Sequence, residues 1–352
     1  MKMQPVLVER IWGGRRLADI LGKALPPDTR IGESWELADH PNGRSRVADG
    51  PLAGQTLREV LERHGPAVVG RTAAARAWAA RFGLLIKFID ATDRLSVQVH
   101  PDDAYASAHV PGESGKTECW VVVHAEPGAW LINGLRPGTT RDRFADALKK
   151  GRIEELLATR PVKAGDFVWV PAGTVHAIGP GIVLAEVQQN SDLTYRVYDW
   201  GRVGLDGKPR PIQVAEALES IRFAGDPARQ PATGRPVAVP GGDAAASPAP
   251  AGGRGKTSDE TGLVIDHLVD SAAFSLSRII LDRRPWAADT RGSCAVLVVL
   301  AGKARLATGD GQTPIRAGDT ILVPADAKEY ALEQPERLTV LVAAPPGKAP
   351  QR

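Results

Sequence analysis

Cysteine is nearly absent from this chain, whose 352 residues include only Cys119 and Cys294. Two cysteines so far apart exclude a disulfide framework and a cysteine-rich zinc site, and they favour a reducing cytoplasm as the compartment. Long apolar runs are also missing, since stretches such as CAVLVVLAG are far too short to cross a bilayer. The N-terminal MKMQPVLVERIWGG has no apolar stretch of the secretory kind. We therefore expect neither a membrane span nor a secretory signal.

A large charge of one sign is absent as well. The chain has 44 Lys and Arg against 41 Asp and Glu, a formal net charge of +3. An electrostatic nucleic-acid binder normally concentrates basic residues in a patch or stripe, so we expect no nucleic-acid partner. A small positive balance is compatible with an anionic small-molecule substrate. The length suffices for a substantial core, and a monomer is the default expectation.

Short runs of β-branched and aromatic residues recur along the chain and are typical of strands. They include LLIKFID, SVQVH, CWVVVHA, GLVIDHLV and RLTVLVAAP. Helical spacing appears in TLREVLERHG and TAAARAWAARFG, which we expect to stop at their final glycines. TTRDRFADALKKGRIEELLATR predicts two short helices, and PIQVAEALESIRF predicts one more. The pattern indicates a mainly β fold with peripheral helices.

The composition changes sharply over residues 224–262, which are rich in Ala, Gly and Pro and poor in large apolar side chains. Such a stretch cannot bury enough surface to offset its ordering entropy, so we expect a linker or a long surface excursion. It divides the chain into a first domain, residues 1–223, and a second, residues 263–352.

One frame, AGD-x3-VPA, occurs once in each part, at residues 164–172 and again at 317–325. In both copies a Gly-Asp turn leads into a buried strand and then a proline turn. The repetition predicts a duplicated antiparallel β-sandwich or barrel. Because Glu329 stands in the second copy where His176 stands in the first, we expect the second domain to be free of metal.

Polar side chains in the first domain are spaced to meet in one place. In SVQVH, strand parity puts Ser96, Gln98 and His100 on one face. Glu118 shares a face with Lys116 in GKTECW, and His176 follows a Pro-Gly turn. A histidine taken singly is more commonly a structural residue. Two imidazoles, a carboxylate and an amide oxygen together predict a site for zinc or a similar divalent ion, with a position left open.

Four motifs, QVHPDD, GKTE, VPAGTVHAIG and QQNSDLTYRVYDW, resemble the motif set of type I mannose-6-phosphate isomerases in their shorter bacterial form. The resemblance extends from IWGG to about residue 223, and the tail fits the second cupin half of that family. It implies a duplicated cupin fold of jelly-roll barrels and one Zn²⁺ per chain. It also implies the reversible conversion of mannose 6-phosphate to fructose 6-phosphate.

The motifs also imply site residues. The family's metal ligands fall on the same four residues, Gln98, His100, Glu118 and His176. Its other functional residues fall on Lys87, Lys116, Glu186, Asp192 and Arg196.

An aldose–ketose isomerisation moves a proton between C2 and C1 through a cis-enediol. Glu186, which we prefer, or Lys116 would transfer that proton. Arg196, on a strand-like run where Thr194 and Tyr198 share its face, would stabilise the enediolate or clamp the phosphate.

The remaining residues are assigned to substrate binding. Ser96 and Lys87 are expected to bind the phosphate, because the hydroxyl shares the cavity face and a lysine in the apolar run LLIKFI needs a partner. Trp12 is expected to line the sugar pocket, and Asp192 to contact the substrate.

Two other functions fit a cupin. One is an iron oxygenase with a two-His, one-carboxylate triad, and the other is a sugar-binding cupin without turnover. Gln98 at the first ligand position argues against the oxygenase, as does the lack of a role for Lys87 and Arg196. The occupied metal, lysine and arginine positions argue against a degenerate site. A hexose 6-phosphate is therefore the expected partner.

Overall fold

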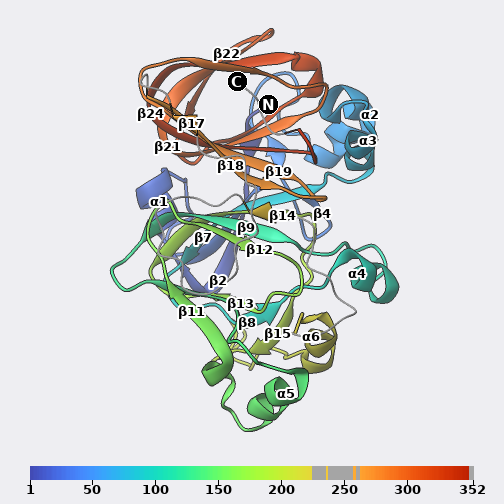
Figure 1. Ribbon diagram of the computed structural model, residues 1–352. Helices are drawn as coiled ribbons and strands as arrows, with labels where there is room; N and C mark the ends of the chain where they lie inside the picture. Colours follow the sequence, from blue (N-terminus) through green and yellow to red (C-terminus); the bar gives the residue numbers. More distant parts are fainter. Residues whose placement is uncertain (224–234, 237–256, 259–261, 349–352) are drawn as a thin grey trace.

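The computed structural model describes residues 1–223, 235–236, 257–258 and 262–348. Figure 1 shows two β-rich halves stacked on one another, with helices at their margins. The predicted fold class, mainly β with peripheral helices, is confirmed. The predicted linker lies largely outside the described residues. Its described pieces form β16 (Arg235–Pro236) and β17 (Thr257–Ser258), which both pair with the strand that follows, β18 (Leu263–Asp270).

The first half consists of two antiparallel sheets. The six-stranded sheet has the order β12 (Phe167–Val170), β9 (Glu118–Ala125), β14 (Ile182–Gln189), β7 (Leu84–Ala91), β3 (Ile31–Leu37) and β2 (Val6–Gly14). The five-stranded sheet has the order β11 (Leu157–Pro161), β10 (Trp130–Leu135), β13 (His176–Ile178), β8 (Val97–Val99) and β15 (Tyr195–Tyr198).

The second half is a single sheet of nine strands in the described part of the chain. Its main path runs β16, β18, β19 (Ser275–Leu281), β24 (Glu329–Ala344), β21 (Ala295–Thr308) and β22 (Gly311–Arg316). Off this path, β17 pairs with β18, β20 (Trp286–Asp289) with β24, and β23 (Thr320–Val323) with β21. Two ribbons complete the β structure: β1 (Met3–Gln4) with β6 (Arg46–Val47), and β4 (Asp39–His40) with β5 (Gly43–Arg44).

The helices are short and peripheral. They are α1 (Arg16–Leu21), α2 (Leu57–Val69), α3 (Ala73–Ala80), α4 (Asp103–His109), α5 (Arg141–Lys149), α6 (Val214–Ser220) and the 3-10 turns η1 (Ile153–Leu156) and η2 (Ala325–Ala327). Four of them carry a side-chain N-cap, among them Asp102, which begins the unforeseen helix α4. No helix in the described ranges is both long and apolar enough to cross a membrane.

The expected stop of the first long helix at Gly65 is wrong. Helix α2 continues through Gly65 and Pro66 and ends at Val69, followed by the C-cap Gly70, which has a φ of 94°. Gly65 instead serves packing, since a Cβ built there would lie 3.2 Å from the Cβ of Ala79 in α3. The glycine thus permits a close approach between two helices rather than ending one.

The repeated AGD frame makes the same turn in both halves. The backbone N–H of Lys163 donates to the Asp166 carboxylate at 3.0 Å, and Arg316 donates to Asp319 at 3.0 Å. Each turn leads into a four-residue strand, β12 in the first half and β23 in the second. The frame is therefore a repeated structural unit.

Register extends this correspondence to the predicted metal ligands. The last residue of β12 pairs with Glu118 on β9, and the last residue of β23 pairs with Ala295 on β21. Likewise His176 opens β13, whereas Glu329 opens β24. At these two positions the second half has Ala295 and Glu329 in place of a carboxylate and an imidazole.

The two halves share one hydrophobic core. Buried residues of the first half, such as Phe88 and Cys119, form a single cluster with Phe274, Val296 and Leu341 of the second. The N-terminus also contacts the second half, since the Met1 amino group donates to the Leu322 carbonyl at 3.0 Å. The second half therefore supports the sheet from which the candidate site is built.

Candidate active site

A cavity of about 590 Å³ opens between the two sheets of the first half. Its lining draws on segments far apart in sequence. Residues from the six-stranded sheet include Arg10, Trp12, Glu33, Lys87, Trp120 and Glu186. Residues on or beside the five-stranded sheet include Ser96, Gln98, His176, Thr194 and Arg196, and Arg210 follows in the next loop.

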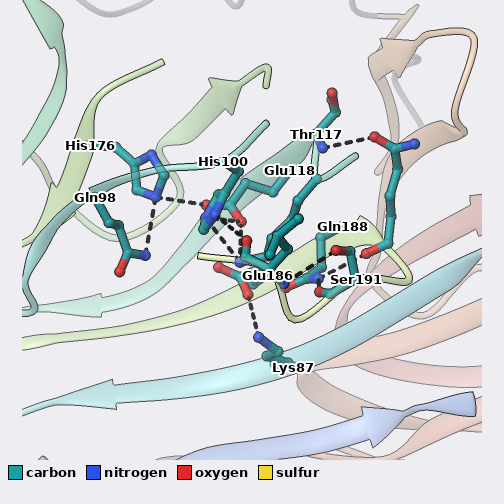
Figure 2. A network of polar contacts seen from close by, with 12 residues as sticks. Lys87, Gln98, His100, Thr117, Glu118, His176, Glu186, Gln188 and Ser191 are labelled. Carbon is teal, nitrogen blue, oxygen red and sulfur yellow. Dashed lines mark hydrogen bonds and ion pairs between the residues drawn. The ribbon is translucent and has the colours of Figure 1, made fainter. Parts of the chain in front are cut away.

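Three predicted ligands meet beside this cavity, which His176 lines. The nearest atoms of His100, Glu118 and His176 lie within 4.8 Å of one another, and all three side chains are buried. Nε2 of His100 lies 3.4 Å from one Glu118 oxygen, and Nε2 of His176 lies 3.4 Å from the other. Figure 2 shows both imidazoles gathered beside Glu118, with Gln98 at their edge. Strand pairing brings the two histidines close together, because His176 lies directly opposite Gln98, two residues before His100.

Both imidazoles direct an unprotonated Nε2 toward the cluster. His100 Nδ1 lies 2.8 Å from the Leu193 carbonyl, and His176 Nδ1 lies 2.9 Å from the Thr174 carbonyl. A carbonyl only accepts hydrogen bonds, so each Nδ1 carries the proton and each Nε2 keeps a lone pair. Burial, and then the Lys116 charge, lowers the pKa of His100 to about 3, and burial also lowers the pKa of His176. Neutral imidazoles in this tautomer are in the state that binds a metal.

Glu118 is the residue in need of a partner. Neither of its oxygens accepts a hydrogen bond from any residue that the structure describes, although Lys116 Nζ lies 2.9 Å from Oε2. Burial alone would raise the pKa of this carboxyl, but the Lys116 ammonium and the His100 imidazole hold it well below its usual range. A buried carboxylate that accepts no hydrogen bond from the described residues and faces two unprotonated imidazole nitrogens fits a divalent cation.

Next to the cluster lies a chain of buried charges. Lys87 Nζ is 3.2 Å from Glu186 Oε1 and 3.8 Å from a Glu33 oxygen. Strand register brings this about, since Lys87 lies opposite Glu186 in β14 and Trp35 in β3. The two carboxylates raise the pKa of Lys87, although burial alone would lower it. Figure 2 shows Lys87 directed at Glu186.

The pKa of Glu186 is shifted in the opposite direction to that of Glu118. Trp120 Nε1 donates to Glu186 Oε2 at 2.9 Å, whereas Oε1 accepts no hydrogen bond from the described residues. Burial and the negative charge of Glu118 raise the pKa of Glu186. One oxygen fixed by Trp120, one oxygen that accepts no hydrogen bond within the described part of the chain, and a raised pKa are the properties of a carboxylate that exchanges protons.

Arg196 lies on β15 opposite Gln98. Its Nε donates to Ser96 Oγ at 3.1 Å and its Nη1 to the Pro211 carbonyl at 3.0 Å. Both acceptors are neutral, and Arg196 forms no ion pair with any described residue. It is therefore a half-buried positive charge at the cavity that contacts no carboxylate of the described residues.

Comparison with known proteins decides the family. The sequence profile described as "Phosphomannose isomerase type I, catalytic domain" matches residues 1–115. Mannose-6-phosphate isomerase ManA of Bacillus subtilis is 36% identical over 94% of both chains, and the Streptococcus mutans mannose-6-phosphate isomerase is 35% identical over 94% of both. The chain belongs to the type I phosphomannose isomerase family.

A solved structure of this family supports the fold. The crystal structure of the mannose 6-phosphate isomerase from Bacillus subtilis superposes with a TM-score of 0.80 at 32% identity, covering 97% of this chain and 98% of that one. The cupin fold expected from the motifs is confirmed by this match. The type I resemblance read from QVHPDD, GKTE and VPAGTVHAIG is confirmed as well.

Gln98, the fourth ligand expected for a type I enzyme, shows its amide in an unexpected orientation. Its Nε2 lies 3.2 Å from His176 Nε2, and its Oε1 accepts from Ser96 Oγ at 3.3 Å. Rotating the amide by 180° would turn Oε1 toward the cluster, and oxygen is the atom that ligates metals. The side chain is in place, but its orientation leaves ligation by Gln98 a prediction.

The other predicted residues also reach the cavity. Trp12 is buried in its wall, and Asp192 lines the rim, where Asn42 Nδ2 donates to it at 2.9 Å. Thr194 faces the cavity with Arg196, but the expectation that Tyr198 shares this face is wrong. A register shift between Arg196 and Tyr198 turns the tyrosine onto a separate apolar cluster.

Sequence analysis missed several cavity residues, namely Arg10, Glu33, Trp120 and Arg210. Arg10 directly precedes the IWGG motif, and its Nε donates to Glu33 at 2.7 Å. Trp120 follows Glu118 by two residues and so points to the same face of β9. The alternation of side chains along a strand could therefore have predicted it. Glu33 and Arg210 had no such signal, since they reach the cavity only through tertiary contacts.

A metal-content measurement tests the cluster. We expect His176→Ala to lose bound divalent ion, because it removes one of the two unprotonated Nε2 atoms facing Glu118. The measurement is metal per chain by plasma mass spectrometry after dialysis. His124→Ala is the matched control, since His124 also lies on a strand of the first half, β9, but outside the cavity. Full metal occupancy in His176→Ala would show the ligand assignment to be wrong.

Proposed function

We propose that the chain is a metal-dependent aldose–ketose isomerase that interconverts mannose 6-phosphate and fructose 6-phosphate. Family membership supports the reaction, and one structural observation carries the proposal. The buried cluster able to hold a cation reaches the cavity through His176, and Arg196, which forms no ion pair with a described residue, lines the same cavity. A sugar phosphate has hydroxyl and carbonyl oxygens at one end and a dianion at the other, which matches this arrangement. An iron oxygenase would leave the arginine without a role.

The proposed ligands are His100, Glu118 and His176, with Gln98 as a fourth through its amide oxygen. Zinc is the ion we propose, although nitrogen and oxygen ligands accept several divalent ions. When bound, such an ion would supply Lewis-acid polarisation to an oxygen on C1 or C2.

We assign proton transfer to Glu186. Glu186 lines the cavity, its Oε1 accepts no hydrogen bond from the described residues, and burial raises its pKa toward the range that suits a group that accepts and returns a proton. In this assignment Oε1 takes the proton from C2 of the aldose and returns it to C1, while Trp120 holds the other oxygen. Lys116 is less suited, because its ammonium already lies 2.9 Å from Glu118 and 3.0 Å from His100 Nε2.

Lys87 has a positioning role in this scheme. Sequence reasoning assigned it to the phosphate, but it lies between two carboxylates, Glu186 and Glu33. The charge of Lys87 is already balanced by these carboxylates, so it would attract an anion less strongly than Arg196 would. We therefore propose that Lys87 orients Glu186, and that Arg196 with Ser96 binds the phosphate. Trp12 forms the wall of the sugar pocket, and Asp192 stands at its rim.

The division of labour between the halves is part of the proposal. We infer a catalytic domain over residues 1–223 and a supporting, metal-free domain over 263–352, because Ala295 and Glu329 occupy the positions that correspond to two ligands. Two buried, unpaired cysteines favour the cytoplasm.

The function is tested by turnover before and after metal removal. Purified protein should convert mannose 6-phosphate in an assay coupled to fructose 6-phosphate consumption. Treatment with a chelator should abolish turnover, and added Zn²⁺ should restore it. Absence of turnover by the metal-loaded protein would contradict the proposed function.

Substitution of the proposed base tests the assignment within the site. We expect Glu186→Gln to lower kcat about 10²- to 10⁴-fold, the usual contribution of a general base. The bound metal should remain, because the variant leaves all four proposed ligands intact. Tyr198→Phe is a suitable control, since Tyr198 lies outside the cavity. A kcat close to that of the unsubstituted enzyme would exclude Glu186 as the base.

A further inference from the structure

The segment that follows β15 folds back over Arg196. Val203 and Pro209 form a β-bridge within it, and the Gly204 N–H donates to the Lys208 carbonyl at 2.7 Å. Beyond the bridge, the Gln213 N–H donates to the Arg196 carbonyl at 2.9 Å. We call residues 201–213 the return loop. It closes one side of the cavity, to which it contributes Gly204, Leu205, Asp206 and Arg210.

Arg210 is held in this loop in a defined orientation. Its Nε donates to Asp199 Oδ2 at 2.7 Å, and its Nη2 donates to Asp199 Oδ1. Two parallel bonds to one carboxylate fix the plane of a guanidinium. The third nitrogen, Nη1, donates to no described residue, and the side chain lines the cavity. Arg210 is thus held in a fixed orientation by Asp199, and its Nη1 remains available to donate a hydrogen bond.

Arg196 and Arg210 line the cavity together, although they repel one another. Of the charges that act on Arg196, Arg210 has the largest effect, and after burial it contributes most to the lowered pKa of the Arg196 guanidinium. Asp199 compensates Arg210, but no described residue forms an ion pair with Arg196. Two guanidinium groups held close to one cavity are stabilised when an anion lies between them. A dianion accepts donors from both groups at once.

We propose that Arg210 is a second phosphate-binding arginine, which donates through its free Nη1 while Asp199 acts as its positioning residue. The inference rests on the proposed function, in which Arg196 and Ser96 bind the phosphate, and it adds the return loop to that site. It makes Arg210 a determinant of specificity for phosphorylated over neutral sugars. The reacting end of the sugar, beside Glu118 and Glu186, is not touched by it.

Inorganic phosphate is the probe, because its binding is measured without turnover. We expect Arg210→Gln to weaken phosphate binding to the metal-loaded protein about 10- to 100-fold in titration calorimetry, the effect of losing a charge-assisted hydrogen bond. The KM for mannose 6-phosphate should rise by a similar factor, with a smaller change in kcat. Arg210→Lys keeps the charge and should lose less affinity, so it serves if the glutamine variant does not fold.

Arg202→Gln is the matched control. Arg202 also donates to Asp199, at 2.8 Å, but it does not line the cavity. Its phosphate affinity should stay within about threefold of the unsubstituted protein. Equal losses in the Arg202 and Arg210 variants, or no loss in either, would overturn the inference, as would failure of the unsubstituted protein to bind phosphate. Failure of turnover with these binding results intact would count against the proposed function alone.

Discussion

A fully buried carboxylate has to be compensated by positive charge, and Glu118 is such a carboxylate. Desolvation of an unpaired carboxylate costs several kcal/mol, roughly the scale of a domain's whole stability. Lys116 supplies one positive partner, yet the Glu118 lone pairs still face two neutral imidazoles through their unprotonated nitrogens. A divalent cation there would satisfy the carboxylate and both imidazoles at once. The Glu118 charge also acts on its neighbours, since it raises the pKa of Glu186.

The fold meets that demand by joining two sheets of one half. Glu118 comes from the six-stranded sheet and His176 from the five-stranded sheet, so the cluster forms only when the sheets face each other. The second half repeats the AGD turn but has Ala295 and Glu329 at the two corresponding positions, and its apolar residues extend the core behind β9. We propose that the first copy of the repeated unit carries the chemistry and that the second stabilises it.

Much of this arrangement was predictable from local pattern. Strand parity correctly put Gln98 on the cavity face, and the motifs brought His100, Glu118 and His176 together. Local pattern failed where neighbouring elements decide the outcome. Gly65 lies within a helix because α3 packs closely against it, and Tyr198 changes face because β15 contains a bulge. The contact of Glu33 with Lys87 joins segments more than fifty residues apart, so the residue spacing within either segment could not predict it.

The central claim is that one divalent cation binds between Glu118 and the two imidazoles. X-ray anomalous scattering from metal-loaded crystals, recorded on both sides of the zinc absorption edge, tests it most directly. The account predicts one strong peak, about 2.0–2.2 Å from His100 Nε2, His176 Nε2 and a Glu118 oxygen. No peak at this position in an active, metal-loaded protein, or a peak bound by other residues, would contradict it.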